Sequence, residues 1–135
     1  MELNAKYNPA EVEDKWYSYW INNRCFHSEP DSREEAVAML KALSGRTHEV
    51  ITAVTVRDTS HMETVTDSTM VHFRKLEDSE IDYYIDNFRP YDKAGAYGIQ
   101  EWIGYAAITG IEGSFYNVMG FPVHKVYEEL IKFAG

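Results

Sequence analysis

Residues 47–73, THEVITAVTVRDTSHMETVTDSTMVHF, decide the fold of this chain. Residues 47–56 and 63–73 are rich in β-branched residues, and apolar and polar side chains partly alternate in both segments. That composition is typical of strands with one buried face. The polar run at residues 57–61, RDTSH, separates the two segments. The stretch therefore predicts two antiparallel strands joined by a turn.

Helices are predicted on both sides of this hairpin. Ser32 and Glu35 form a capping box that begins a helix, and Gly45 ends it. After the hairpin, a short helix begins at Ser79 and ends before Pro90, because the residue preceding a proline disfavours helical dihedrals.

The last third of the chain predicts one more strand and two more helical segments. Residues 105–111 have the pattern of a strand, residues 114–119 that of a helical turn capped by Ser114, and residues 122–133 that of a terminal helix. The predicted inward residues of the terminal helix are Val126, Leu130 and Phe133. Together these elements predict an α/β fold with a curved, mostly antiparallel sheet and flanking helices.

An additional amphipathic helix is predicted at the amino terminus. Asn8, Pro9 and Glu11 form a helix start. One face carries the apolar residues Val12, Trp16, Tyr19 and Trp20. This face packs either on apolar surface that the rest of the chain leaves open or on a catalytic domain that this sequence lacks.

Composition limits the classes of function. The chain of 135 residues is 44% hydrophobic, which suits one globular domain, and its formal net charge of −9 opposes a nucleic-acid-coating role. No long apolar run predicts a membrane span, and Cys25 is the only cysteine. These features predict a soluble cytoplasmic protein without a nucleic-acid or membrane partner.

Residues 91–102, YDKAGAYGIQEW, carry the clearest candidate chemistry. Gly95 and Gly98 permit positive φ or close approach to a ligand, Lys93 offers a point charge to a phosphate, and the Gln100 amide both donates and accepts hydrogen bonds. Two interpretations fit: a polar loop that binds an anion or nucleotide, and a helix end followed by a buried Tyr/Trp core.

A family resemblance rests on several runs in order: EAVAML at 35–40, LSGRTHEV at 43–50, YDKAGAYGIQEW, and GIEGSFYNVMGFPVH at 110–124. From about residue 34 to 135 the chain resembles the carboxyl-terminal part of the Maf family of nucleoside triphosphate pyrophosphatases. Residues 1–33 instead resemble the amino terminus of a bacterial valyl-tRNA synthetase. We therefore expect two segments, 1–33 and 34–135, that meet near Ser32.

The Maf resemblance implies a Maf/ITPase-like carboxyl-terminal lobe and hydrolysis of dTTP or UTP to the monophosphate and pyrophosphate with Mg²⁺ or Mn²⁺. It implies that Gln100 sets base preference and that Lys93 contacts phosphate or orders the loop. Gly98 and Asp92 complete the predicted substrate-binding set, with Asp92 ordering the loop and not binding metal. A homodimer is expected, because surface left by an absent half would be covered by self-association.

Other family motifs are missing. We find no Ser-x-x-Arg phosphate loop, no Asp-Thr-Val-Val segment with the catalytic aspartate, and no Gly-Lys-Pro lysine; Glu29 precedes Pro30 instead. Asp58 lies in the hairpin turn, so it does not take the catalytic role. With no catalytic residue or metal ligand assigned, activity should be impaired in this chain. The alternatives are an inactive fusion or fragment that at most binds nucleotide or self-associates, and a truncated valyl-tRNA synthetase.

Overall fold

The computed structural model describes residues 29–134, so the predicted helix at the amino terminus lies outside the described residues. The elements are α2 (Arg33–Leu43), β1 (Thr47–Arg57), β2 (Met62–Phe73), α3 (Asp78–Phe88), η1 (Ala94–Ala96), α4 (Trp102–Ala107), β3 (Ile108–Glu112), α5 (Phe115–Met119) and α6 (Val123–Ala134). The three strands form one antiparallel sheet in the order β1-β2-β3. The predicted α/β class and antiparallel sheet are confirmed.

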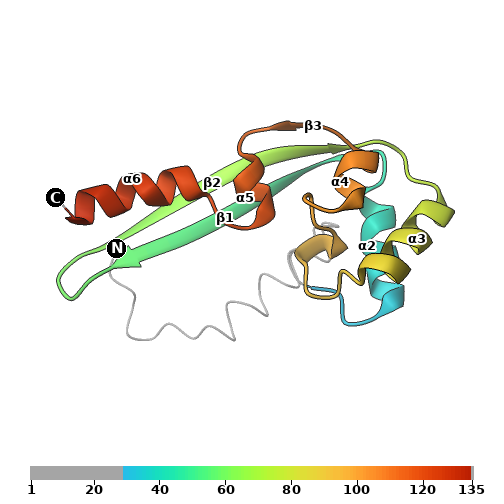
Figure 1. The fold of residues 1–135 in the computed structure, drawn as a ribbon, viewed down its shortest axis with the longest axis horizontal. Helices are drawn as coiled ribbons and strands as arrows, with labels where there is room; N and C mark the ends of the chain where they lie inside the picture. Colours follow the sequence, from blue (N-terminus) through green and yellow to red (C-terminus); the bar gives the residue numbers. More distant parts are fainter. Residues whose placement is uncertain (1–28, 135) are drawn as a thin grey trace.

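The long hairpin β1–β2 is the axis of the molecule (Figure 1). Its register runs unbroken from the Thr47–His72 pair to the Arg57–Met62 pair. At the tip, Asp58 Oδ1 accepts hydrogen bonds from the backbone N–H groups of Ser60 and His61, each at 2.7 Å. These bonds lower the pKa of Asp58 and close the turn. Asp58 is thus a turn residue, as its place in the sequence predicts.

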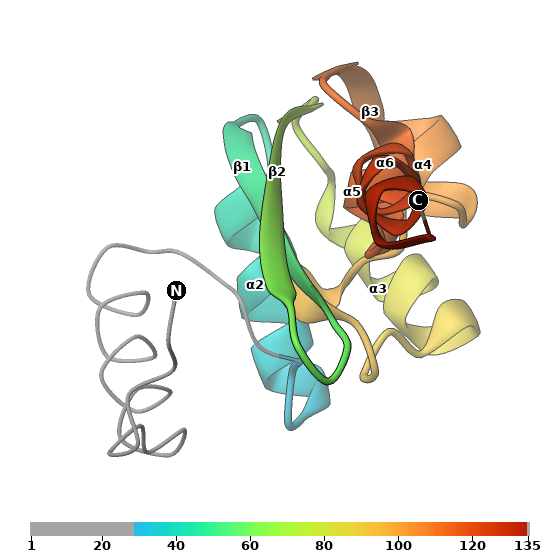
Figure 2. The ribbon, with the colours of Figure 1, turned by 90° about the vertical axis from the view of Figure 1, so that its left-hand side faces the viewer.

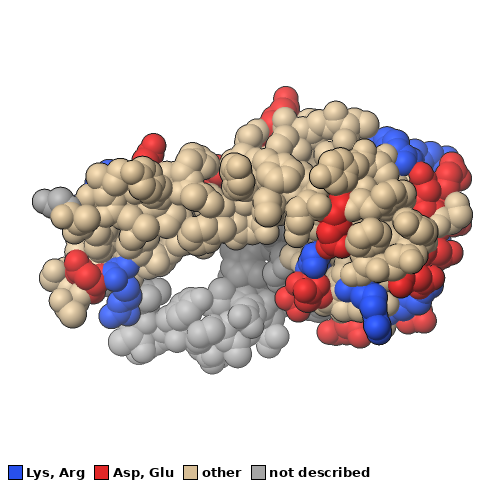
Figure 3. All heavy atoms as spheres, viewed as in Figure 1, with Lys and Arg blue, Asp and Glu red and all other residues tan. Residues whose placement is uncertain are grey.

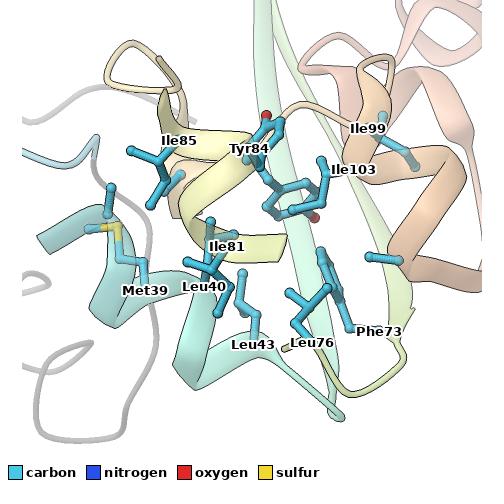
Figure 4. Packing of buried hydrophobic residues seen from close by; sticks show 14 of the residues in the cluster. Met39, Leu40, Leu43, Phe73, Leu76, Ile81, Tyr84, Ile85, Ile99 and Ile103 are labelled. Atoms are coloured by element: carbon cyan, nitrogen blue, oxygen red, sulfur yellow. The ribbon is translucent and has the colours of Figure 1, made fainter. Parts of the chain in front are cut away.

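The main core lies at one end of the hairpin, where α2, α3 and α4 gather (Figures 1 and 4). Leu40 of α2, Ile81 and Tyr84 of α3, and Ile103 of α4 are each at most 1% exposed. The start of α2 is the predicted one, because Ser32 Oγ accepts from the Glu35 N–H at 3.1 Å. The loop between α3 and α4 joins this core through its buried residues Ala96, Tyr97 and Ile99, so helix packing at this end of the sheet holds that loop in place.

The predicted strand at residues 105–111 is wrong in its first half. Helix α4 continues to Ala107, and β3 begins only at Ile108. The cause is a distant residue: Arg74 Nε donates to the Ala106 carbonyl at 2.6 Å, and the Arg74 N–H donates to the Ala107 carbonyl at 2.9 Å. These donors satisfy the helix's last carbonyl groups, which would otherwise lack partners.

Helix α6 lies along the far half of the hairpin, on the same side as α5 (Figures 1 and 2). Its predicted stripe is only partly right: Val126 is 6% exposed, but Leu130 is 50% exposed. The buried stripe instead runs from Val126 through the Glu129 side chain, which is 12% exposed, to half-buried Phe133. Leu130 is exposed because only one side of α6 meets the sheet.

Charged side chains gather over the α2–α3 end, whereas the surface over α5 and α6 is largely uncharged (Figure 3). Arg33 of α2 binds two carboxylates of α3, Asp82 at 3.0 Å and Asp86 at 2.9 Å. These contacts pair two exposed carboxylates of α3 with one cation of α2. Within residues 29–134, no helix has the length and apolar character needed to cross a bilayer.

A buried polar junction attaches α5 to the hairpin. Thr69 Oγ1 accepts from Asn117 Nδ2 at 2.9 Å and from the Ser114 N–H at 3.1 Å. Asn117 Nδ2 also donates to the Val50 carbonyl at 3.1 Å, so one amide holds both strands. Thr69 and Asn117 are fully buried, which makes each of these hydrogen bonds costly to lose.

Substituting Thr69→Val tests this junction, because valine keeps the shape but removes the acceptor for two donors. We expect the free energy of unfolding to fall by about 2–4 kcal/mol. Thr55→Val is the matched control, because Thr55 is likewise a strand threonine whose hydroxyl is hydrogen-bonded, in this case to Thr64 across the hairpin on the exposed face. For this variant the loss in free energy of unfolding should stay within about 0.5 kcal/mol. Urea unfolding measures both, and equal losses would contradict the junction's role.

Candidate functional site

A cavity of about 450 Å³ opens between the hairpin and the loop that precedes α4. Its walls are residues 48–52 of β1, the loop around η1, and residues 117–120 at the end of α5. All four residues predicted to bind substrate line it: Asp92, Lys93, Gly98 and Gln100. The volume falls in the range of small-ligand sites. Their binding role stays a prediction, but the fold brings them to one cavity.

The loop combines the two interpretations that the sequence left open. Gly95 has a φ of +72°, as its glycine predicts, and Tyr97 is buried at 8% exposure, whereas Gln100 is exposed. The Gly98 N–H donates to the Tyr84 hydroxyl at 3.0 Å. Burial raises the pKa of that hydroxyl, so it stays protonated. The aromatic core thus anchors the loop and leaves its polar residues at the cavity.

Lys93 lies between two carboxylates. Its Nζ is 3.0 Å from Asp92 Oδ1 and 3.2 Å from Glu101 Oε1, and these contacts raise the pKa of Lys93. A Cβ atom at Gly98 would lie 2.7 Å from Glu101 Oε1 and 2.9 Å from Lys93 Cε, so glycine makes room for this pair. The Asp92 side chain is 77% exposed and that of Glu101 18%, so water screens the Asp92 contact more strongly.

The Gln100 side chain makes no hydrogen bond to any other residue that the structure describes. It also lines a second hollow of about 320 Å³ beside Tyr105 and Phe115. An exposed carboxamide at a cavity wall can offer its donor and its acceptor to a ligand. Gln100 is therefore not sealed in an apolar interior, which would have excluded its predicted role.

His48 is a cavity residue that the sequence analysis did not single out. Its Nε2 lies 2.6 Å from the Tyr97 hydroxyl, and its ring packs against Phe73 with centroids 5.5 Å apart. Burial, together with repulsion from His72, lowers the pKa of His48 to about 4, so the imidazole is neutral at pH 7. The available signal is strand alternation, since His48, Val50 and Thr52 share the less exposed face of β1.

The described cavity residues do not fit a divalent cation by themselves. The two carboxylates on its walls are engaged, Glu49 with the Ser68 hydroxyl and Asp92 with Lys93. In the part of the chain that the structure covers, no group of three or more potential ligands from His, Cys, Asp and Glu is found. A hard cation requires several oxygen ligands at once. The described side chains that line the cavity do not supply such a set of ligands.

Comparison with known proteins bears on this arrangement of loop and hairpin. The Maf family, described as Maf-like protein, matches residues 17–133. The chain belongs to the Maf family. This match begins before residue 34, where the sequence analysis placed the start of the Maf resemblance. The proposed junction near Ser32 and the synthetase resemblance stay predictions.

Named relatives support the same assignment. A dTTP/UTP pyrophosphatase of Porphyromonas gingivalis is 58% identical over 104 residues, 77% of this chain and 52% of the relative. The dTTP/UTP pyrophosphatase of Parabacteroides distasonis is 55% identical over 104 residues, 77% of this chain and 54% of the relative. That of Bacteroides thetaiotaomicron is 47% identical over 113 residues, 84% of this chain and 58% of the relative. The chain therefore spans about half the length of these relatives.

The neutral, buried His48 should make stability depend on pH. An unfolded histidine titrates near 6.5 and His48 near 4, so the unfolded state binds more protons between these values and acidification destabilises the fold. From pH 7.0 to 5.5 we expect a loss of about 1 kcal/mol.

Urea unfolding of the wild type and of His48→Phe at both pH values measures this loss. The variant should lack it. The ion pair with Arg74 lowers the pKa of Glu80 to about 2, from an ordinary value of 4.5. The contribution of this pair to the free energy of unfolding is therefore lost only below pH 4.5, outside the range from pH 7.0 to 5.5 in which His48 is tested. An equal loss in both proteins would contradict the assignment to His48.

Proposed function

We propose that this chain acts as a nucleoside triphosphate pyrophosphatase on dTTP and UTP, releasing the monophosphate and pyrophosphate. The carrying observation is the cavity beside β1, where an exposed carboxamide, Gln100, and a cation, Lys93, share one wall. Further support comes from the relatives, which are named dTTP/UTP pyrophosphatases. The cavity is the base and sugar site, and Lys93 marks the phosphate end.

Each residue of the loop has a proposed task. Gln100 supplies a donor and an acceptor to the pyrimidine edge, and Lys93 binds a phosphate oxygen after that oxygen displaces Asp92. Gly98 keeps Glu101 against Lys93, so the ammonium stays positioned when Asp92 leaves. The buried aromatic ring of Tyr97 packs edge-on against Phe73 and supports the loop from behind.

Mg²⁺ or Mn²⁺ is the proposed cofactor, on the ground of family membership. No catalytic base is assigned, because the cavity carboxylates are all hydrogen-bonded or ion-paired in the described part of the chain. That observation favours a second candidate function, nucleotide binding without hydrolysis. Both candidate functions predict that the chain binds the nucleotide, but only the first predicts release of pyrophosphate.

Pyrophosphate release from dTTP and UTP, measured with Mg²⁺ beside binding by calorimetry, tests the proposal. Gln100→Glu places a carboxylate that can only accept where the base carbonyls also accept, so we expect affinity for UTP to fall about tenfold or more. Lys93→Ala should lower the affinity for UTP about tenfold but the affinity for uridine much less, because only UTP carries phosphate.

Lys41→Ala is the matched control, since Lys41 is an exposed lysine of α2 that lies outside the cavity. Binding that is unchanged in both loop variants would overturn the site assignment. Binding without pyrophosphate release would establish the second candidate in place of the first.

We further propose that the chain forms a homodimer through the largely uncharged surface over α5 and α6. This surface carries side chains that are 47–63% exposed: Tyr116, Met119, Phe121, Val123, Tyr127, Leu130 and Ile131. Adjacent apolar side chains of this kind typically mark an interface. A cytoplasmic location, favoured by the single cysteine and the nucleotide substrate, completes the proposal.

Sedimentation velocity tests the dimer. Leu130→Glu together with Ile131→Glu should shift the chain to monomer, because two charges cannot be buried unpaired in an interface. Wild-type chain that sediments as a monomer at micromolar concentration would contradict this part of the proposal.

A further inference from the structure

A second hollow, of about 320 Å³, opens beside β3. Its walls are residues 108–111 of β3, part of α4 with the end of the loop before it, and Phe115 of α5. None of the described residues that line it is charged. An apolar cavity of about 150 Å³ is large enough to bind benzene. The hollow therefore has room for one aromatic side chain.

Tyr105 stands at the rim of this hollow. Its side chain is 87% exposed, more than any other large hydrophobic side chain in residues 29–134. Ile103 and Ala107, four residues apart on α4, are each 1% exposed, so Tyr105 between them lies on the opposite face of the helix. A Cβ atom at Gly104 would lie 1.8 Å from the Ile99 carbonyl oxygen, so α4 packs too closely to rotate. The fold thus makes Tyr105 project.

A surface with a projecting ring beside a hollow of suitable size is complementary to a copy of itself. In a two-fold dimer the same surface serves both chains, so each ring enters the hollow of the other copy. The position of β3 fits this arrangement, because β3 is an edge strand of the described sheet. Edge strands of two copies related by a two-fold axis can lie antiparallel to each other.

Electrostatics also favour this part of the surface for self-association. Each copy carries a formal net charge of −9, so two copies repel unless they meet through uncharged surface. Charged side chains gather over the α2–α3 end, whereas the described lining of the hollow has none (Figure 3). The Phe115 ring meets the Tyr116 ring edge-on at a centroid distance of 5.9 Å, and Tyr116 belongs to the surface over α5 and α6. The hollow therefore continues that surface.

The exposed apolar area is of the size that a stable dimer needs. Tyr105, Phe115 and the seven side chains of the surface over α5 and α6 are each at least 41% exposed. Each offers roughly 100 Å², which amounts to on the order of 900 Å² per copy. A specific interface of standard size buries about 800 Å² on each partner.

We propose that the hollow beside β3 receives Tyr105 of a second copy of this chain, and that the seated ring packs against Gln100 of the receiving copy. This inference rests on the proposed function and gives its dimer a defined centre. Gln100 is exposed and lines both the hollow and the cavity beside β1. The second copy therefore fixes a side chain of the cavity wall. By linkage, dimer formation and nucleotide binding favour each other.

Sedimentation velocity of Tyr105→Ser tests the seat, with Tyr83→Ser as the matched control. Both variants lose an exposed tyrosine ring, but Tyr83 lies on α3, outside the hollow. We expect Tyr105→Ser to raise the dissociation constant of the dimer at least tenfold and Tyr83→Ser to change it less than twofold. Because Tyr105 is exposed in the single chain, its loss should leave the fold intact, which circular dichroism checks.

Photo-crosslinking locates the ring directly. A benzophenone amino acid at position 105, in a mixture of ¹⁴N- and ¹⁵N-labelled chains, should form crosslinks between copies to residues 108–111 or to Phe115. Crosslinks between copies that reach only other parts of the surface would overturn the seat.

Calorimetric titration with uridine monophosphate tests the contact with Gln100. We expect Tyr105→Ser to bind the nucleotide about fivefold more weakly than the wild type. Equal affinity together with a weakened dimer would overturn the contact with Gln100.

The remaining outcomes separate the inference from the proposed function. A dimer that survives Tyr105→Ser but separates in Leu130→Glu with Ile131→Glu overturns the inference and leaves the proposed dimer standing. A monomeric wild type overturns both. A dimer that is lost in Tyr105→Ser but binds no nucleotide confirms the seat and overturns the proposed activity.

Discussion

The side-chain amide of Asn117 is the contact on which the site depends. It joins α5 to both long strands through the Val50 carbonyl and the Thr69 hydroxyl, in a place that water does not reach. Without it, residues 117–120 would not be held against β1, and the cavity would lose one of its three walls. A single polar residue in a short helix therefore connects the stability of the fold to the shape of the cavity.

The second wall has a different physical basis. The loop before α4 is held from behind by aromatic packing, with Tyr97 against Phe73 at a centroid distance of 5.1 Å, and its polar side chains face the cavity. Lys93 is held by Glu101 on one side and by an exposed Asp92 on the other. The formal net charge of −9 repels anions over most of the surface, and Lys93 is the one lysine or arginine among the described residues that line the cavity.

Local patterns in the sequence were sufficient for part of this structure. The hairpin, the Asp58 turn and the Ser32 cap follow from neighbouring residues, and the structure confirms them. The end of α4 depends on Arg74, about thirty residues earlier, and the exposure of Leu130 depends on how little of the sheet α6 meets. Such contacts between distant segments leave no periodic signal in the sequence.

The same distinction applies to the site. Lys93 and Gln100 could be singled out because they stand in a glycine-rich run, which is typical of ligand loops. His48 in a strand and Asn117 in a short helix carry no such local signal. Their place at the cavity comes from contacts between segments that lie far apart in the sequence.

The most direct test of the account is an NMR titration of the ¹⁵N-labelled chain with uridine monophosphate. The account predicts shifts concentrated at the backbone amides of Gly95 and Gly98 and at the side-chain amides of Gln100 and Asn117, with the hairpin turn at Asp58 unaffected. Shifts confined to α3 or α6, or none at all at millimolar nucleotide, would contradict it.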